Sequence, residues 1–313
     1  MFADTESIWP ERPAEHAGPI LDHVNGFDII DCEACGFRHV MPLPDAAAQE
    51  AAYRDAYYTE EKPTYLTRAR EDQEWASLAS RDRLEALLAH LDPHLPAPRR
   101  LLDVGCGPGY FLEMAKQEGW NVLGVEPSRQ AAAHARKLGV NVIEGFFGPV
   151  MAEMIDPMHA VHMNNVLEHV PNPIELVETA RRVLHPGGLV CVGVPNDYNA
   201  FQRALREADG YKPWWLAPPH HLNYFDFESL ERLLTRQGFT VLDATATFPM
   251  ELFLLMGENY VGDDAAGRAC HARRKRFDLT LEKAGLGDVR RRLYRALGGA
   301  GLGREISIIA RKS

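Results

Sequence analysis

Apolar residues follow two different periods along the middle of the chain. Short apolar runs, typical of buried strands, occupy 100–104, 121–125, 141–144, 160–164 and 189–194. Between these runs, apolar residues recur every three or four positions, which predicts helices at about 110–118, 128–138 and 174–184. Strands that alternate with helices in this way form a parallel sheet with right-handed crossovers. The pattern therefore predicts a doubly wound α/β domain.

The segments on either side of this region have different patterns. Apolar residues at helical spacing precede it, and strands predicted at 240–246 and 305–310 follow it as an expected antiparallel pair. Between these two strands lies a helical insertion, and we expect its stripe of Val289, Leu293 and Leu297 to pack on the core. We predict four parts: a zinc-knuckle-like element at 1–44, a helical cap at 45–95, the α/β domain at 96–247 with 305–313, and a helical lid at 248–304.

Composition indicates a folded protein of the reducing interior of the cell. The chain has 313 residues, 46% of them hydrophobic, which is enough to bury a full core. We find no export signal and no apolar run long enough to span a bilayer, and the five cysteines are an odd number. We therefore expect a cytoplasmic monomer or homodimer with no membrane span.

Charge is distributed unevenly along the chain. The net charge of −10 argues against general binding to nucleic acid, whose phosphates require a basic surface. The segment 268–304 nevertheless carries eleven Lys and Arg residues against three acidic ones, a local balance of +8. This basic segment predicts an anionic small-molecule acceptor rather than a nucleic-acid partner.

A glycine-rich turn follows the first strand of the α/β region, in Leu-Leu-Asp-Val-Gly-Cys-Gly-Pro-Gly at 101–109. Glycines allow close approach to the main chain, and a helix N-terminus with its free N–H groups suits a polar ligand. Glu126 ends the next strand, where a carboxylate can accept hydrogen bonds from two ribose hydroxyls. These features fit NAD as well as S-adenosylmethionine (SAM), but the Gly-x-Gly-x-Gly spacing departs from the dinucleotide pattern.

Four segments in order, between about 99 and 196, resemble the motif set of class I SAM-dependent methyltransferases. They are the turn at 101–109, Gly-Val-Glu-Pro-Ser, Asn-Val-Leu-Glu-His-Val-Pro-Asn-Pro and Leu-His-Pro-Gly-Gly. The resemblance implies SAM as cofactor and a Rossmann-like, mostly parallel seven-stranded sheet with an antiparallel last strand. It assigns SAM to Asp103, Gly105, Cys106, Gly107, Gly109, Tyr110, Phe111, Glu126, Pro127, Gly145, Phe146, Asn165, Val166 and Leu167, with Tyr58 and Tyr65 closing over it.

The segment 214–225 is the predicted acceptor site. Its Pro-His-His-Leu-x-Tyr-Phe pattern resembles methyltransferases of sugars and other small metabolites, in which a histidine of this stretch can act as base. We predict His221, and after it His220, as the general base, with helix capping or turn packing as the alternative. The residues expected to contact the acceptor are Asn196, Trp214, Trp215, Tyr224, Glu251, Tyr260 and Arg304.

The predicted activity is methyl transfer from SAM to a hydroxyl or amine of a small acceptor. We expect this acceptor to be anionic or to contain a sugar, as in a nucleotide sugar or another precursor of polysaccharide biosynthesis. Sugar C-methylation is one alternative, although His-His stands where such relatives tend to carry Glu-His. A non-catalytic SAM-binding accessory protein is another.

Cys32-Glu-Ala-Cys35-Gly predicts a zinc knuckle, because two thiolates separated by two residues can bind one tetrahedral ion. His23 and His39 supply the expected third and fourth ligands, and His16 or Asp22 are substitutes. The pattern resembles the N-terminal zinc element found ahead of some sugar methyltransferases. We expect a structural zinc here, with a metal-free turn as the alternative.

Overall fold

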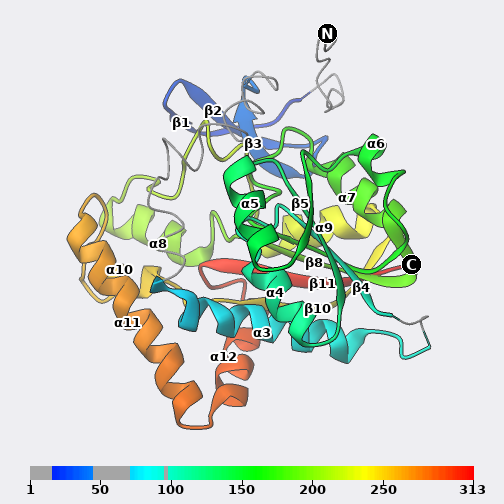
Figure 1. The fold of residues 1–313 in the computed structure, drawn as a ribbon. Helices are drawn as coiled ribbons and strands as arrows, with labels where there is room; N and C mark the ends of the chain where they lie inside the picture. The colour runs from blue at the N-terminus through cyan, green and yellow to red at the C-terminus, as the bar shows by residue number, and fades with distance from the viewer. Residues whose placement is uncertain (1–15, 45–70, 95–97) are drawn as a thin grey trace.

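Two sheets organise the chain in a computed structural model that describes residues 16–44, 71–94 and 98–313 (Figure 1). The larger sheet has the strand order β10-β11-β8-β7-β4-β5-β6, and β11 runs antiparallel to both of its neighbours. The fold prediction is confirmed, including the long-range pair formed by the last two strands. The strands are β4 (Arg100–Val104), β5 (Asn121–Glu126), β6 (Asn141–Glu144), β7 (Met158–Asn164), β8 (Leu184–Pro195), β10 (Phe239–Ala246) and β11 (Glu305–Lys312).

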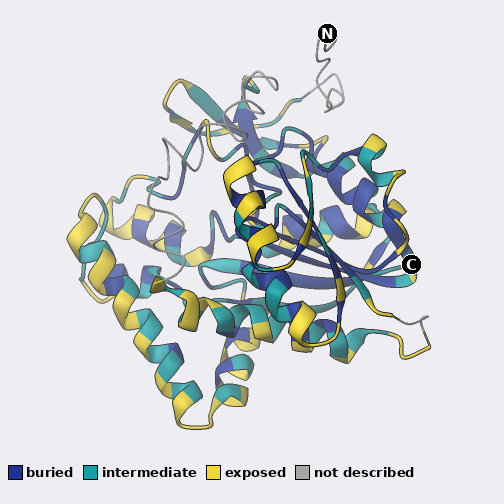
Figure 2. Cartoon of the chain, in the orientation of Figure 1, coloured by how far each residue is buried: buried dark blue, intermediate teal, exposed yellow. Residues whose placement is uncertain are grey.

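Helices cover both faces of this sheet, so its strands are buried (Figure 2). Side chains of α3 (Gln73–His90), α4 (Tyr110–Gln117) and α5 (Arg129–Lys137) share one core with one face of the sheet. Side chains of α7 (Pro173–Val183) and α9 (Phe227–Arg236) share the second core with the other face. The remaining short helices are α6 (Pro149–Ala152) and α8 (Ala200–Asp209). Among the described residues, no helix combines the length and apolarity needed to cross a bilayer.

Three helices form the insertion between β10 and β11: α10 (Glu251–Leu255), α11 (Asp264–Lys283) and α12 (Gly287–Gly299). The last two make a hairpin that extends from the body of the protein (Figure 1). The predicted apolar stripe is wrong, because Val289 and Leu293 are 36% and 40% exposed. The buried face of α12 instead carries Arg290 and Tyr294.

The basic segment 268–304 is largely neutralised within the chain, by acidic residues of α3 above all. Arg290 makes two hydrogen bonds to Asp82, at 2.7 and 2.9 Å. Lys275 pairs with Asp72 in the turn before α3. Much of the local charge therefore holds the α11–α12 hairpin against α3, and it is not free for an anionic ligand as the sequence suggested.

The smaller sheet is antiparallel and has the order β1-β2-β3-β9, with β1 (Ile20–Val24), β2 (Phe27–Cys32) and β3 (Phe37–Met41). Its fourth strand, β9 (Asn223–Tyr224), comes from the predicted acceptor segment nearly two hundred residues later. The sequence pattern did not predict this sheet, since β9 has only two residues. The pairing of β3 with β9 joins the N-terminal element to the segment that carries His221.

Candidate cofactor and acceptor site

A cavity of about 550 Å³ opens at the carboxyl ends of the parallel strands. Its walls come from the turn after β4, the ends of β5 and β7, and the loop after β6. Two helices complete them: α3, which precedes the sheet, and α11, which belongs to the insertion. The carboxyl edge of a doubly wound sheet is where such folds bind ligands. Twelve residues predicted to bind SAM line it: Asp103, Gly105, Cys106, Gly107, Tyr110, Phe111, Glu126, Pro127, Gly145, Phe146, Asn165 and Val166.

Four other residues predicted to bind SAM do not line this cavity or lie outside the described part of the chain. Gly109 precedes α4 and packs behind the turn, where a Cβ would lie 2.6 Å from that of Ala135. Leu167 is completely buried in the core. Tyr58 and Tyr65 fall in 45–70, outside the described residues.

The glycine turn lies very close to the loop after β7. Gly105 has φ +70°, and a Cβ there would lie 2.7 Å from Val166 Cγ2, so only glycine fits. The N–H groups of Gly105 and Cys106 donate to Val125 O, and that of Gly107 donates to Glu126 Oε2 at 2.8 Å. Several N–H groups of the turn are thus used inside the protein. The glycines allow other groups to approach the main chain of the turn closely.

Glu126 is a buried carboxylate at the end of β5. It accepts hydrogen bonds from the N–H groups of Gly107 and Ser128, at 2.8 and 2.9 Å. Burial raises the pKa of the Glu126 carboxyl to about 7, and these two N–H groups oppose that rise. Each carboxylate oxygen keeps a second acceptor position, so an ionised Glu126 can still bind ribose hydroxyls.

Asp103 is held by a histidine that the sequence reasoning did not assign. His162, on the neighbouring strand β7, hydrogen-bonds through Nδ1 to Asp103 Oδ1 at 2.6 Å. The His162 ring stacks on Phe111 with ring centroids 3.8 Å apart. Parallel pairing of β4 with β7 aligns Asp103 with His162, so the contact follows from the sheet register.

The loop after β7 and the acceptor segment meet at the other side of the cavity. Glu168, His169 and His221 each offer a polar atom within 4.8 Å of the others, and all three line the cavity. His169 Nδ1 donates to the main-chain oxygen of His220 at 2.8 Å. The His220 side chain is exposed and does not line the cavity. Of the two predicted bases, the structure thus brings only His221 to the cavity.

The main chain fastens these two segments together. Leu222 and Asn223 donate their N–H groups to Glu168 O at 2.7 and 3.1 Å. The Asn223 side chain donates to Leu167 O and Val170 O, at 2.7 and 2.8 Å. The position of His221 therefore depends on the Glu168 loop and on β9.

The residues predicted to contact the acceptor do not line the cavity. Asn196 is buried and donates to the main-chain oxygens of Gly301 and Gly303. Trp215 and Tyr224 are buried in one core with Ile29 and Val40 of the smaller sheet. These aromatic and polar side chains hold the fold together, which sequence spacing alone does not reveal. The others that do not line the cavity are Trp214, Glu251, Tyr260 and Arg304.

The cavity residues that the sequence reasoning missed include three on the helices α3 and α11, namely Trp75, Arg83 and Arg274. Trp75 and Arg83 lie on α3, whose apolar spacing predicted a helix but not which polar side chains face a ligand. Arg274 lies on α11 and reaches the cavity because α11 packs against α3. No motif marks these positions, since they come together only in the tertiary structure.

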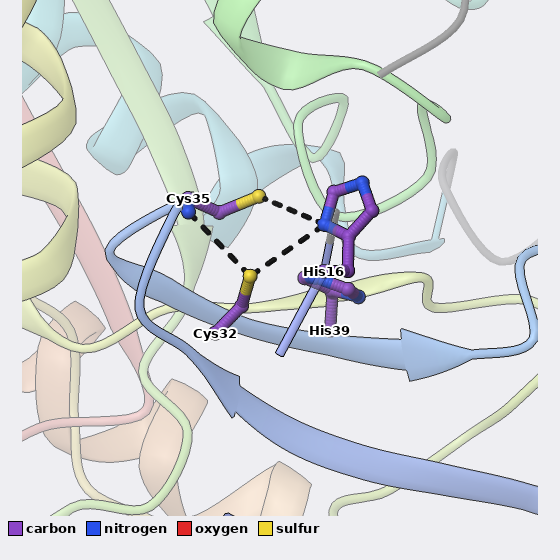
Figure 3. Close-up of side chains that lie close together, drawn as sticks. All are labelled: His16, Cys32, Cys35 and His39. Atoms are coloured by element: carbon purple, nitrogen blue, oxygen red, sulfur yellow. Dashed lines mark hydrogen bonds between the residues drawn. The ribbon is translucent and has the colours of Figure 1, made fainter. Parts of the chain in front are cut away.

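A second cluster of polar side chains lies in the smaller sheet, where His16, Cys32, Cys35 and His39 point toward one another (Figure 3). His16 Nδ1 lies 3.5 Å from Cys32 Sγ and 3.4 Å from Cys35 Sγ. His39 Nδ1 donates to Val40 O at 2.9 Å, so its neutral tautomer carries the lone pair on Nε2. Both cysteines and His39 are buried.

His23 is absent from this cluster, contrary to the sequence prediction. It lies on β1 opposite Asp28, its Nδ1 is 2.8 Å from Asp28 Oδ1, and its side chain is 68% exposed. Asp22, a suggested substitute, pairs with Arg206 instead. His16, the other substitute, takes the position because the chain before β1 runs back along β2 toward Cys32.

Comparison with known proteins points to one family. A family model described as a methyltransferase domain matches residues 72–244. A ubiquinone biosynthesis O-methyltransferase of Sinorhizobium fredii is 32% identical over 167 residues, which cover 50% of this chain and 67% of that protein. A protein of the same name from Rhizobium etli is 30% identical over 156 residues, covering 48% of this chain and 63% of its own length. The chain thus spans about two thirds of these relatives.

A solved structure shows the same fold. Magnesium protoporphyrin IX methyltransferase from Synechocystis, crystallised with SAH, superposes with a TM-score of 0.51. The match covers 86% of this chain and 100% of that one, at 12% sequence identity. At this identity the likeness concerns the fold alone.

Proposed function

The chain belongs to the class I SAM-dependent methyltransferases, and from this premise we propose that it transfers the methyl group of SAM to a hydroxyl of a small acceptor. The observation that carries the proposal is that one cavity joins the glycine turn to His221. The names of the relatives from Sinorhizobium and Rhizobium favour oxygen over nitrogen or carbon as the methyl acceptor. When bound, SAM supplies an electrophilic methyl group.

The cavity residues fit SAM on several grounds. The glycine turn admits a ligand to the main chain, and Glu126 offers acceptors for a ribose. Phe146 and Phe147 offer an apolar wall for a base. Arg83 lines the same cavity and has no ion pair with any described residue, so we assign it to the carboxylate of the methionine part.

His221 is proposed as the general base. An in-line methyl transfer needs alignment of acceptor and methyl group, together with removal of the hydroxyl proton. His221 faces the cavity, and its ring centroid lies 4.8 Å from that of His169. Glu168 and His169 act as positioning residues, because they contact His221 and are fastened to the main chain beside it.

The nature of the acceptor beyond its hydroxyl stays a prediction. The relatives reported above are named for ubiquinone biosynthesis, and no sugar occurs in their names. The residues expected to hold a sugar lie away from the cavity. We therefore propose O-methylation of a small molecule without assigning it to polysaccharide biosynthesis.

We expect the affinity for SAM to depend on the ionisation of Glu126. The pKa of this carboxyl is about 7, and only the ionised form accepts from both ribose hydroxyls. The dissociation constant should be flat above pH 7 and should rise about tenfold per unit as the pH falls below it. Titration calorimetry with SAM over this range measures the effect.

Variants of the cofactor end make this test specific. Glu126→Gln should bind SAM more weakly and without the pH dependence, and Asp103→Ala and Arg83→Gln should bind weakly at every pH. Absence of SAM binding by the folded wild type would refute the proposed function. Equal binding by wild type and all three variants would refute the residue assignments.

We further propose that His16, Cys32, Cys35 and His39 bind a structural zinc ion. Zn–S distances near 2.3 Å and Zn–N distances near 2.0 Å at tetrahedral angles place sulfur and nitrogen roughly 3.5 Å apart. The observed separations of His16 Nδ1 from the two Sγ atoms, 3.5 and 3.4 Å, match this value. The hydrogen bond from His39 Nδ1 to a carbonyl orients the ring as it does in many zinc sites.

Metal content tests the ligand set directly. Purified protein should contain one zinc ion per chain, measured by inductively coupled plasma mass spectrometry. His16→Ala should lower the zinc content, whereas His23→Ala, which alters the sequence-predicted but exposed histidine, should leave it unchanged. If His23→Ala lowers the zinc content and His16→Ala does not, or if the wild type contains no zinc, this site is ruled out.

A further inference from the structure

Among the residues that the structure describes, two guanidinium groups line the cavity, and SAM accounts for only one of them. Arg83 comes from α3 and Arg274 from α11. SAM carries a single carboxylate, which the proposed function assigns to Arg83. Arg274 is therefore left without a partner on SAM.

The Arg274 side chain is held in a fixed orientation. Its Cζ lies 4.6 Å from the centroid of the Trp75 ring, and its Nε donates to His271 Nδ1 at 2.9 Å. His271 is held in turn by Asp72, at 2.9 Å. These contacts use one face and one N–H of the guanidinium. Within the described residues, its two terminal nitrogens make no hydrogen bond or ion pair.

This arrangement differs from that of other arginines on the same insertion. Arg273 pairs with Glu258, Arg290 with Asp82 and Arg295 with Asp243. Arg274 is half-buried with no carboxylate within ion-pair distance among the described residues. Glu305 and Asp278 attract the Arg274 guanidinium only from beyond ion-pair distance. A guanidinium withdrawn from water without a direct ion pair is costly, and an anionic ligand would offset that cost.

We propose that Arg274 binds a carboxylate of the acceptor, so that the substrate is a small hydroxylated carboxylic acid. This inference rests on the proposed function. A carboxylate matches the paired terminal nitrogens of a guanidinium. Glu305 faces the same cavity. Its carboxylate would repel a dianionic phosphate more strongly than a singly charged carboxylate.

The surroundings of Arg274 also indicate the body of this acid. Trp75, Ala76 and Ala79 of α3 line the cavity beside it and offer an apolar wall. Pockets of about 300–1,000 Å³ hold a single drug-sized ligand. A cavity of about 550 Å³ that also holds SAM therefore favours a small acceptor.

A matched pair of probes tests the carboxylate assignment. Protein saturated with SAH is titrated with 4-hydroxybenzoate and with its neutral amide, 4-hydroxybenzamide. We expect the acid to bind at least about tenfold more tightly than the amide, in line with the strength of charge-assisted hydrogen bonds. Arg274→Gln should abolish this preference, and Arg274→Lys should retain part of it. Arg276→Gln, on the exposed side of the same helix, is the control and should keep the preference.

Each other outcome has a definite meaning. Equal binding of acid and amide to the wild type would overturn the inference, even if Arg274→Gln fails to fold. A folded Arg274→Gln that loses SAH would show that Arg274 holds the cofactor, which also overturns it. A wild type that does not bind SAH would instead refute the proposed function on which the inference rests.

Discussion

Replacing His221 with alanine is expected to lower kcat by about 10²–10⁴-fold, the usual contribution of a general base. The reason is that His221 lines the cavity beside Glu168 and His169. SAM affinity should stay within about twofold, because the glycine turn and Glu126 lie on other elements. The measurement is SAH release with the best acceptor from a panel of small hydroxylated acids, together with calorimetry for SAM.

The neighbouring histidine is a matched control. His220 shares the segment and was predicted with His221, but its side chain is exposed and away from the cavity. His220→Ala should keep turnover within about threefold, since its main-chain oxygen still accepts from His169. If His220→Ala loses as much activity as His221→Ala, or if His221→Ala retains full activity, the base has been assigned wrongly.

The α/β half of the fold was predictable because its signals are local. Strands predicted at 100–104 and 141–144 coincide with β4 and β6, and the helix predicted at 128–138 begins where the Ser128 side chain caps α5. Each signal lies within a few residues: an apolar run, a capping residue or a glycine turn. The part of the cavity around the glycine turn and Glu126 was predictable for the same reason, since both lie at the ends of predicted strands.

The helical insertion and the side chain that it contributes to the cavity were not predictable, for the opposite reason. Arg290 is buried on α12 because it meets Asp82, 208 positions earlier, and hydropathy assigns such a residue to the surface. Arg274 reaches the cavity only because α11 packs on α3. Both positions depend on contacts between distant segments, which spacing within one segment does not encode.

The His/Cys cluster beside the smaller sheet shows how register decides between two similar histidines. His23 completes a regular spacing in sequence, but on β1 it pairs with Asp28, four residues before Cys32 on β2. At about 3.3 Å per residue, this separates it from the cysteines by roughly 13 Å along the sheet. His16 lies farther away in sequence, but its imidazole is within 3.5 Å of both thiols.

Removing the proposed zinc ion should lower turnover by at least about tenfold, the range seen when groups that orient a site are lost. His39 lies on β3 and is paired with Asn223 of β9, two residues after His221. Val40 also donates its N–H to Leu222 O at 2.9 Å. If β3 loses its fixed position, β9 loses its pairing partner and His221 loses its fixed position in turn. SAM affinity should change little, because the cofactor turn belongs to the other sheet.

The double variant Cys32→Ser/Cys35→Ser measures this coupling, with Cys270→Ser as its control. Cys270 is also a buried thiol, but it lies on α11, away from the smaller sheet. We expect the double variant to lose zinc and turnover together and to keep SAM binding, while Cys270→Ser keeps all three. Treatment of the wild type with a chelator should have the same effect, and added zinc should reverse it. Full turnover by zinc-free protein would show that the metal does not support His221, and that the hydrogen bonds from Leu222 and Asn223 to Glu168 position it without help from β3.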